Sequence, residues 1–204
     1  MRSMPLVVER VEKVRQDSLA SADKQAHALA ERPTQFRDTN NPEHALVVPL
    51  VSSERRRYVP IGYIDNSVIA NNKVSIVPDG TIYHFGVLTS NVHNSWMRCV
   101  AMRMKSDYSY SLSVVYNTFP WPSPTPQQKE KIEKTAQEIL DARALYPDSS
   151  LADLYDPLTM PPELRKAHQK NDAAVMQAYG MPIKDTDEAA CVAWLMRMYQ
   201  EMTS

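Results

Sequence analysis

Glycine is scarce in this chain, and the sites that require glycine are correspondingly excluded. Only four glycines occur among 204 residues. The chain contains neither a G-x-G-x-x-G pattern nor a Walker phosphate loop, and it lacks the G-x-S-x-G and H-E-x-x-H motifs. Because these patterns supply phosphate-binding loops, nucleophiles and metal ligands, we expect no catalytic residues and no cofactor on this chain.

Cysteines and long apolar runs are also rare. Cys99 and Cys191 are the only cysteines, and each lies in an apolar, helix-like segment, which indicates two buried thiols in a reducing compartment. Five scattered histidines form no short pair with a cysteine, so we expect no metal site. The longest apolar runs fall far short of the roughly 18 residues of a membrane helix, and the N-terminus lacks an apolar signal segment. These absences predict a cytoplasmic protein without a membrane partner.

Charge is unevenly distributed along the chain, although the net charge is only -1. Between Ala45 and Lys105, seven cations stand against three acids, which gives +4 for this segment and -5 for the remainder. A basic middle between acidic flanks is typical of a domain with one phosphate-facing surface, and a solvated patch would give the same pattern. The cations are Arg55, Arg56, Arg57, Lys73, Arg98, Arg103 and Lys105.

The two ends of the chain have helical patterns. Residues 4–30 carry apolar positions amid charges, which predicts an amphipathic helix, bent near residues 18–21 and ended by Pro33. Residues 31–44 read as a linker. Beyond Pro126 we expect helices at about 127–145, 161–179 and 186–202, with a short turn at 151–155.

The middle of the chain has strand-like patterns. Strands are predicted at 46–51, 58–64, 73–77, 81–88 and 111–116, with a helix at 90–104 whose methionines we expect in the core. Within 81–88, alternation would place Tyr83 and Phe85 on one face and His84 on the other, where His84 serves as a hydrogen-bonded packing residue. The prediction is an α+β fold: a connector helix and linker (1–44), a small, mostly antiparallel sheet with a packed helix (45–122) and an α-helical bundle tail (123–204).

One segment, from Lys105 to Pro122, combines aromatic rings, small hydroxyls, one cation and one anion. Such a mixture suits a polar, stackable ligand, so nucleic acid is the first ligand to test. Ser111 and Ser113 would share one strand face, where short polar groups can meet base edges. Trp121, between two prolines, is expected to be a hydrophobic anchor.

A second candidate segment places two serines and three consecutive arginines between predicted strands. Guanidinium groups bind phosphate oxygens in a bidentate way, and small hydroxyls donate to the same oxygens. A solvated hairpin tip would have the same composition, and the sequence leaves both interpretations open. The predicted phosphate contacts are Ser52, Ser53, Arg55, Arg56, Arg57, Arg103 and Lys105.

Several ordered motifs extend through most of the chain, and together they resemble one family. They are Val51 to Gly62, Tyr83 to Ser90, Trp96-Met97-Arg98, Lys105 to Ser111, Val115 to Pro122, Leu140 to Arg143 and Leu151 to Pro161. This series resembles the C-terminal part of MmeI-like DNA methyltransferases, the large single-chain type IIL restriction-modification proteins and their methylase-only relatives.

The resemblance implies a fragment of a larger bacterial enzyme. In that family a helical connector and an adenine methyltransferase domain with an Asn-Pro-Pro-Tyr motif precede a target recognition domain and a helical tail. Here the nearest string is Asn40-Asn41-Pro42-Glu43, so the fragment would bind double-stranded DNA without methylating it. S-adenosylmethionine and the catalytic domain would belong to the remainder of the same polypeptide.

The resemblance also implies where bases are contacted. These positions are the turn at Asp79 and Gly80, and the segment Ser111, Leu112 and Ser113. Leu112 and Val114 are apolar where relatives often carry a charge, and an apolar group can touch a thymine methyl. Two alternatives remain: a protein-interaction module that docks a partner subunit, and a small enzyme with an unrecognised site.

Overall fold

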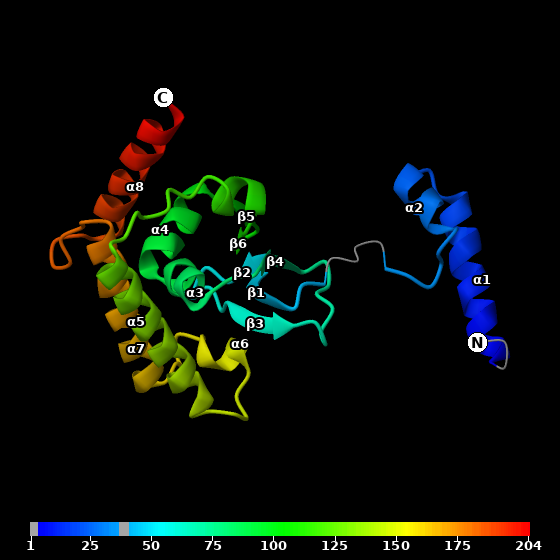
Figure 1. Cartoon of the computed structure of the whole chain (residues 1–204), viewed down its shortest axis with the longest axis horizontal. Helices are drawn as coiled ribbons and strands as arrows, with labels where there is room; N and C mark the ends of the chain where they lie inside the picture. Colours follow the sequence, from blue (N-terminus) through cyan, green and yellow to red (C-terminus); the bar gives the residue numbers. More distant parts are fainter. Residues whose placement is uncertain (1–3, 37–40) are drawn as a thin grey trace. The chain divides into compact units, whose positions relative to one another are not determined.

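The computed structural model describes residues 4–36 and 41–204, which form two compact units (Figure 1). The first unit, Met1–Asn41, contains α1 (Pro5–Ala20) and α2 (Lys24–Leu29). The helix predicted over 4–30 is divided in two near the position of the expected bend. Helix α1 ends at Ala20, and the Asp23 carboxylate caps α2 by accepting from the backbone N–H of Gln25 at 2.9 Å. Residues 37–40 of the expected linker and residues 1–3 lie outside the described residues.

The second unit, Pro42–Ser204, contains two three-stranded antiparallel sheets where one was expected. One has the order β3 (Gly62–Asp65), β1 (His44–Pro49), β4 (Val74–Pro78), and the other β2 (Val51–Ser52), β6 (Asp107–Ser109), β5 (Met102–Met104). The predicted strand 46–51 divides at Leu50. Its N–H donates to the carbonyl of Lys73, which precedes β4 of the first sheet, and its carbonyl accepts from the N–H of Tyr110, which follows β6 of the second. The mostly antiparallel α+β class is confirmed.

The predicted strand 81–88 is wrong: this segment is helix α3 (Ile82–Thr89). Thr81 and His84 form a capping box, in which the backbone N–H of Thr81 donates to His84 Nδ1 at 3.1 Å. The predicted alternation of Tyr83 and Phe85 therefore does not occur, whereas the packing and hydrogen-bonding role of His84 is confirmed. Gly86 allows α3 to approach helix α5 (Pro126–Ala144), because a Cβ there would lie 2.8 Å from Ile132 Cγ2.

The helix predicted at 90–104 is shorter than expected. Ser90 caps α4 (Asn91–Val100), and β5 follows. Met97 is buried, but Met102 and Met104 are exposed on β5, so the expectation of a methionine core holds only within the helix. Cys99 is exposed and Cys191 is buried, so the prediction of two buried thiols is half wrong.

The C-terminal helices are confirmed to within about two residues. They are α5, α6 (Leu151–Leu154), α7 (Pro162–Ala178) and α8 (Glu188–Thr203). Figure 1 shows α5 beside α7, and Ile132 and Ile139 of α5 are fully buried together with Leu164 of α7. None of the described helices is long and apolar enough to cross a membrane. The boundary at residue 122 stays a prediction.

Two carboxylate contacts join α7 to the rest of the core, and we call Tyr58, Asn91 and Asp172 the polar junction. The Tyr58 hydroxyl donates to Asp172 Oδ2 at 2.7 Å, and the backbone N–H of Asn91 donates to Asp172 Oδ1 at 2.7 Å. Beside them, Asn171 Nδ2 donates to the Gly86 carbonyl at 2.7 Å. These buried bonds fix α3 and α4 against α7.

Candidate nucleic-acid interface

The segment Ser111–Ser113 lies at the start of a π-helical turn (Leu112–Tyr116), so the strand predicted at 111–116 is wrong. The backbone N–H of Asn117 donates to the Leu112 carbonyl at 2.8 Å, five residues back. The Ser111 and Ser113 hydroxyl oxygens lie 2.9 Å apart, and Ser113 is exposed. Although the strand face is absent, the two hydroxyls still lie side by side, and π-helical turns are frequent at functional sites.

Buried and half-buried aromatic residues pack against this turn. Val115 is fully buried, and its carbonyl accepts from Trp96 Nε1 at 3.2 Å. Trp121 contacts the rings of Tyr116 and His84, with centroid distances of 5.9 and 5.6 Å. Trp121 is therefore the anchor that the sequence predicted, and it links the π turn to the capping box of α3.

The turn at Asp79 and Gly80 leads directly into α3. Asp79 is exposed and has a φ of 55°, a left-handed conformation that is uncommon for residues other than glycine. Gly80 is buried, and a Cβ at this position would lie 2.7 Å from Leu46 Cγ. The Asp79 side chain is thus presented to solvent, whereas Gly80 permits a close approach of the backbone to β1.

The arginine loop, which we define as residues 53–57, joins strands of different sheets and is not a hairpin tip. Arg55 and Arg57 are exposed and Arg56 is half-buried, with a buried Nε that has no hydrogen-bond partner. Ser52 is only 3% exposed because β2 pairs with β6, so its hydroxyl does not lie on the surface. Ser53 accepts from the backbone N–H of Arg55 at 3.4 Å and shapes the loop.

The hairpin of β5 and β6 places Arg103 and Lys105 differently. The Arg103 guanidinium lies 3.8 Å from the Tyr108 ring centroid, donates to the Ser106 carbonyl at 2.6 Å and pairs with Glu54 at 3.4 Å. Arg103 therefore holds the hairpin and the arginine loop together. Lys105 is exposed at the hairpin tip with a φ of 58°.

A further contact, which the sequence analysis missed, fixes the arginine loop to helices α4 and α8. Arg98 on α4 donates through Nε and Nη2 to the two Glu188 carboxylate oxygens at 2.7 and 3.0 Å, and through Nη1 to the Arg57 carbonyl at 3.1 Å. Arg98 and Glu188 are 90 residues apart, and no local pattern in the sequence indicates the pair.

Burial keeps three titratable side chains, His84, His93 and Cys191, in their neutral forms. Burial lowers the pKa of His93 to about 3 and raises the pKa of the Cys191 thiol to about 11. Burial, followed by the nearby Lys129 charge, also lowers the pKa of His84. These groups are therefore neutral at pH 7 and suit packing better than acid–base chemistry. Among the described residues, no three His, Cys, Asp or Glu side chains gather at a metal-binding distance.

Comparisons with known proteins agree with this arrangement. Two family descriptions match: "MmeI, target recognition domain" over residues 1–123 and "MmeI, C-terminal domain" over residues 124–204. DNA methyltransferase A of Bacillus subtilis (strain 168) is 41% identical over 204 residues, which is 100% of this chain and 23% of that protein. The type IIL restriction-modification enzyme MmeI, solved in complex with DNA, matches with a TM-score of 0.92 and 46% identity over 99% of this chain and 27% of that chain.

The chain thus spans about a quarter of the length of these relatives. The two family descriptions together cover every residue, and the solved relative has the same fold over nearly the whole chain. This chain belongs to the MmeI family, with the target recognition domain at residues 1–123 and the C-terminal domain at residues 124–204.

Proposed function

We propose that this chain recognises a specific sequence in double-stranded DNA as the recognition module of a site-specific adenine DNA methyltransferase. The observation that carries the proposal is the pair of neighbouring hydroxyls at Ser111 and Ser113, at the start of a π turn that the buried Trp96 holds in place. The matching solved relative is a restriction-modification enzyme in complex with DNA, which supports the same ligand class.

Base contacts are assigned to what we call the reading surface, which consists of the exposed Asp79 and Ser113 and the half-buried Ser111 and Leu112. Hydroxyls donate to or accept from base edges, the Asp79 carboxylate accepts from a cytosine amino group, and Leu112 suits a thymine methyl. Gly80 contributes by allowing the Asp79 turn to pack on Leu46. Fixed backbone positions favour sequence discrimination, because misplaced hydrogen-bonding groups lose their partners.

Phosphate contacts are assigned to cations of the arginine loop and of the hairpin of β5 and β6. Arg55 and Lys105 are exposed, and Arg56 is half-buried. Such contacts position a protein on the duplex without reading its sequence. Ser53 and Arg103 act indirectly, because they shape the arginine loop and the hairpin.

The remaining parts of the enzyme would lie elsewhere on the same polypeptide. A methyltransferase domain would bind S-adenosylmethionine and accept an adenine flipped out of the duplex. We assign no S-adenosylmethionine contact and no catalytic group to the residues of this chain, and we expect a bacterial cytoplasmic location. The exposed apolar residues of α1, including Leu6, Val8 and Val14, suit docking to another domain or partner protein.

The test is a competition titration of the full chain with a fluorescent duplex. This duplex carries the sequence that the wild-type chain enriches from a pool of random duplexes, which we call the selected site. Replacing both hydroxyls, Ser111→Ala with Ser113→Ala, should lower the preference for the selected site over a mismatched site by about tenfold or more. Ser149→Ala removes an exposed hydroxyl far along the chain and should leave the preference unchanged.

Two results would contradict the proposal. One is an unchanged preference in the double variant. The other is an absence of duplex binding at low salt together with salt-insensitive binding to a protein partner, which would support the interaction-module alternative.

A further inference from the structure

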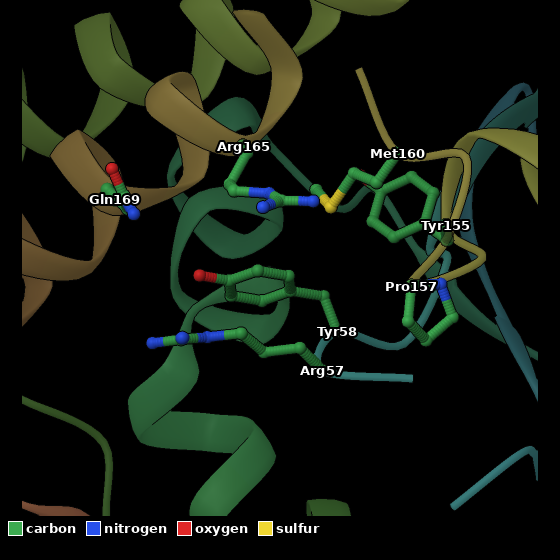
Figure 2. Close-up of a pocket in the computed structure, with 7 residues that line it drawn as sticks. All are labelled: Arg57, Tyr58, Tyr155, Pro157, Met160, Arg165 and Gln169. Carbon is green, nitrogen blue, oxygen red and sulfur yellow. The ribbon is translucent and has the colours of Figure 1, made fainter. Parts of the chain in front are cut away.

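A small cationic cleft lies between the arginine loop and α7, outside the reading surface. Its volume is about 240 Å³, and its lining includes two arginines, two tyrosines and a glutamine (Figure 2). In the view of Figure 2 the Arg165 guanidinium group is drawn above the Tyr58 ring and the Arg57 guanidinium group below it, and the Arg57 group lies 5.6 Å from the ring centroid. The principal lining residues are Arg57, Tyr58, Tyr155, Met160, Arg165 and Gln169.

The charge of this cleft is unbalanced. No carboxylate lines it, and among the described residues neither Arg57 nor Arg165 forms an ion pair with an acid. The nearest buried acid, Asp172, already accepts from the Tyr58 hydroxyl and the Asn91 N–H. No ion pair joins Asp172 to Arg57 or Arg165. Two unpaired guanidiniums beside an amide donor therefore favour an anionic ligand.

Both arginines are attached to fixed backbone. The Arg57 carbonyl accepts from Arg98 at 3.1 Å, and the next residue, Tyr58, is 2% exposed and bonded to Asp172. Arg165 lies in the first turn of α7, where its N–H donates to the Pro161 carbonyl at 3.0 Å. One arginine thus comes from the segment that matches the target recognition domain and the other from the segment that matches the C-terminal domain.

We propose that this cleft binds a backbone phosphate of duplex DNA, so that Arg57 and Arg165 hold the DNA jointly from the two segments. The proposal rests on the function proposed above. Arginine suits this role because its planar guanidinium forms two parallel bonds to phosphate oxygens. The cleft also continues the arginine loop, so the phosphate would follow those held by Arg55 and Arg56 without touching a base.

The test compares two charge-removing variants of adjacent α7 residues in the full chain, Arg165→Gln and Lys166→Gln. Both residues are exposed, but only Arg165 lines the cleft. Duplex binding is measured by fluorescence anisotropy between about 50 and 200 mM salt. Arg165→Gln should weaken binding about fivefold or more, equally for selected and unrelated duplexes, and should reduce the salt slope by about 1. Lys166→Gln should have a smaller effect on both.

Arg165→Lys separates geometry from charge. It should recover only part of the lost affinity, because an ammonium cannot make the paired bonds. Circular dichroism melting of each variant checks that the fold is intact. Full recovery by Arg165→Lys, or equal losses in Arg165→Gln and Lys166→Gln, would overturn the cleft while leaving DNA recognition standing.

A titration with inorganic phosphate distinguishes the two sources of a phosphate ligand. If inorganic phosphate raises the melting temperature of the wild-type chain but not of Arg165→Gln, and duplex binding is the same in both, the cleft binds free phosphate and the DNA assignment is wrong. If the wild-type chain binds no duplex at low salt, the proposed function fails and this assignment fails with it.

Discussion

In the polar junction, hydroxyl and carboxylate groups of Tyr58 and Asp172 are buried and bonded to each other. On the reading surface, Ser113 and Asp79 carry the same chemical groups in exposed positions. Loss of a partner in the first region leaves a polar group unsatisfied in the core, whereas water replaces a lost partner in the second. Stability and base discrimination are therefore expected to depend on different residues, so that one can change without the other.

The largest effect should follow from removal of the junction carboxylate. Asp172→Ala leaves the Tyr58 hydroxyl and the Asn91 N–H without their partner, which should cost about 3 kcal/mol of the free energy of unfolding. Urea denaturation followed by circular dichroism measures this cost. Asp148→Ala, at an exposed position, is the matched control and should stay within about 0.5 kcal/mol of wild type. Similar costs for the two variants would contradict the comparison.

A second effect should appear in the pH dependence of the free energy of unfolding, through the titration of Asp172 in the polar junction. Burial raises the pKa of Asp172 to about 6 in the folded chain, against about 3.9 in an unfolded chain. Between these values the folded state binds more protons, so the stability that this group contributes is present at low pH and is lost as pH rises through about 6. The expected loss is on the order of 2 kcal/mol.

Asp172→Asn isolates this effect, because asparagine does not titrate and its oxygen still accepts from Asn91. As pH rises from about 4 to 7, the wild type should lose stability relative to Asp172→Asn. Burial lowers the pKa of His93, so the contribution of His93 to stability rises with pH. Because both chains contain His93, this trend cancels when their free energies of unfolding are subtracted. Parallel stability curves would show that Asp172 titrates normally in the folded chain.

The smallest effect concerns Lys105 at the tip of the hairpin of β5 and β6. Lys105 has a φ of 58°, a conformation that costs lysine more than glycine. Lys105→Gly should therefore leave the free energy of unfolding unchanged or raise it by up to about 1 kcal/mol, while removal of the cation weakens duplex binding and lowers its salt slope. Thermal melting and anisotropy titrations measure the two quantities. A destabilised variant would indicate that the Lys105 side chain supports the fold.

The elements that followed the sequence prediction are those with local signals. Helices α5 and α8 begin at capping residues, Thr125 and Asp187, and have few helix breakers. Helix α3 did not follow, because Tyr83, Phe85 and Val87 alternate like a strand and Gly86 lowers the helix propensity. Tertiary packing decides this case, since only a glycine lets α3 lie so close to α5.

The candidate site was predicted in its composition and only partly in its geometry. The small residues at 111–113 and the arginines were found from residue type and from the family resemblance. The burial of Ser52 and the packing of Arg103 on Tyr108 were missed, because both depend on how β2, β5 and β6 pair. Arg98 with Glu188, and the cleft at Arg165, join distant segments and leave no local signal.

The π turn has a consequence for how recognition can change between related proteins. A π turn closes a hydrogen bond over one residue more than an α turn. Deletion of one residue between Leu112 and Tyr116 would therefore convert it to an α turn, with Ser111 and Asn117 still near their present positions. After deletion of one residue, the side chains that follow it within the turn would rotate by about 100° about the helix axis. Length variation at this turn is thus a way to replace the groups of the reading surface while Trp96 and Trp121, which lie outside the turn, remain in place.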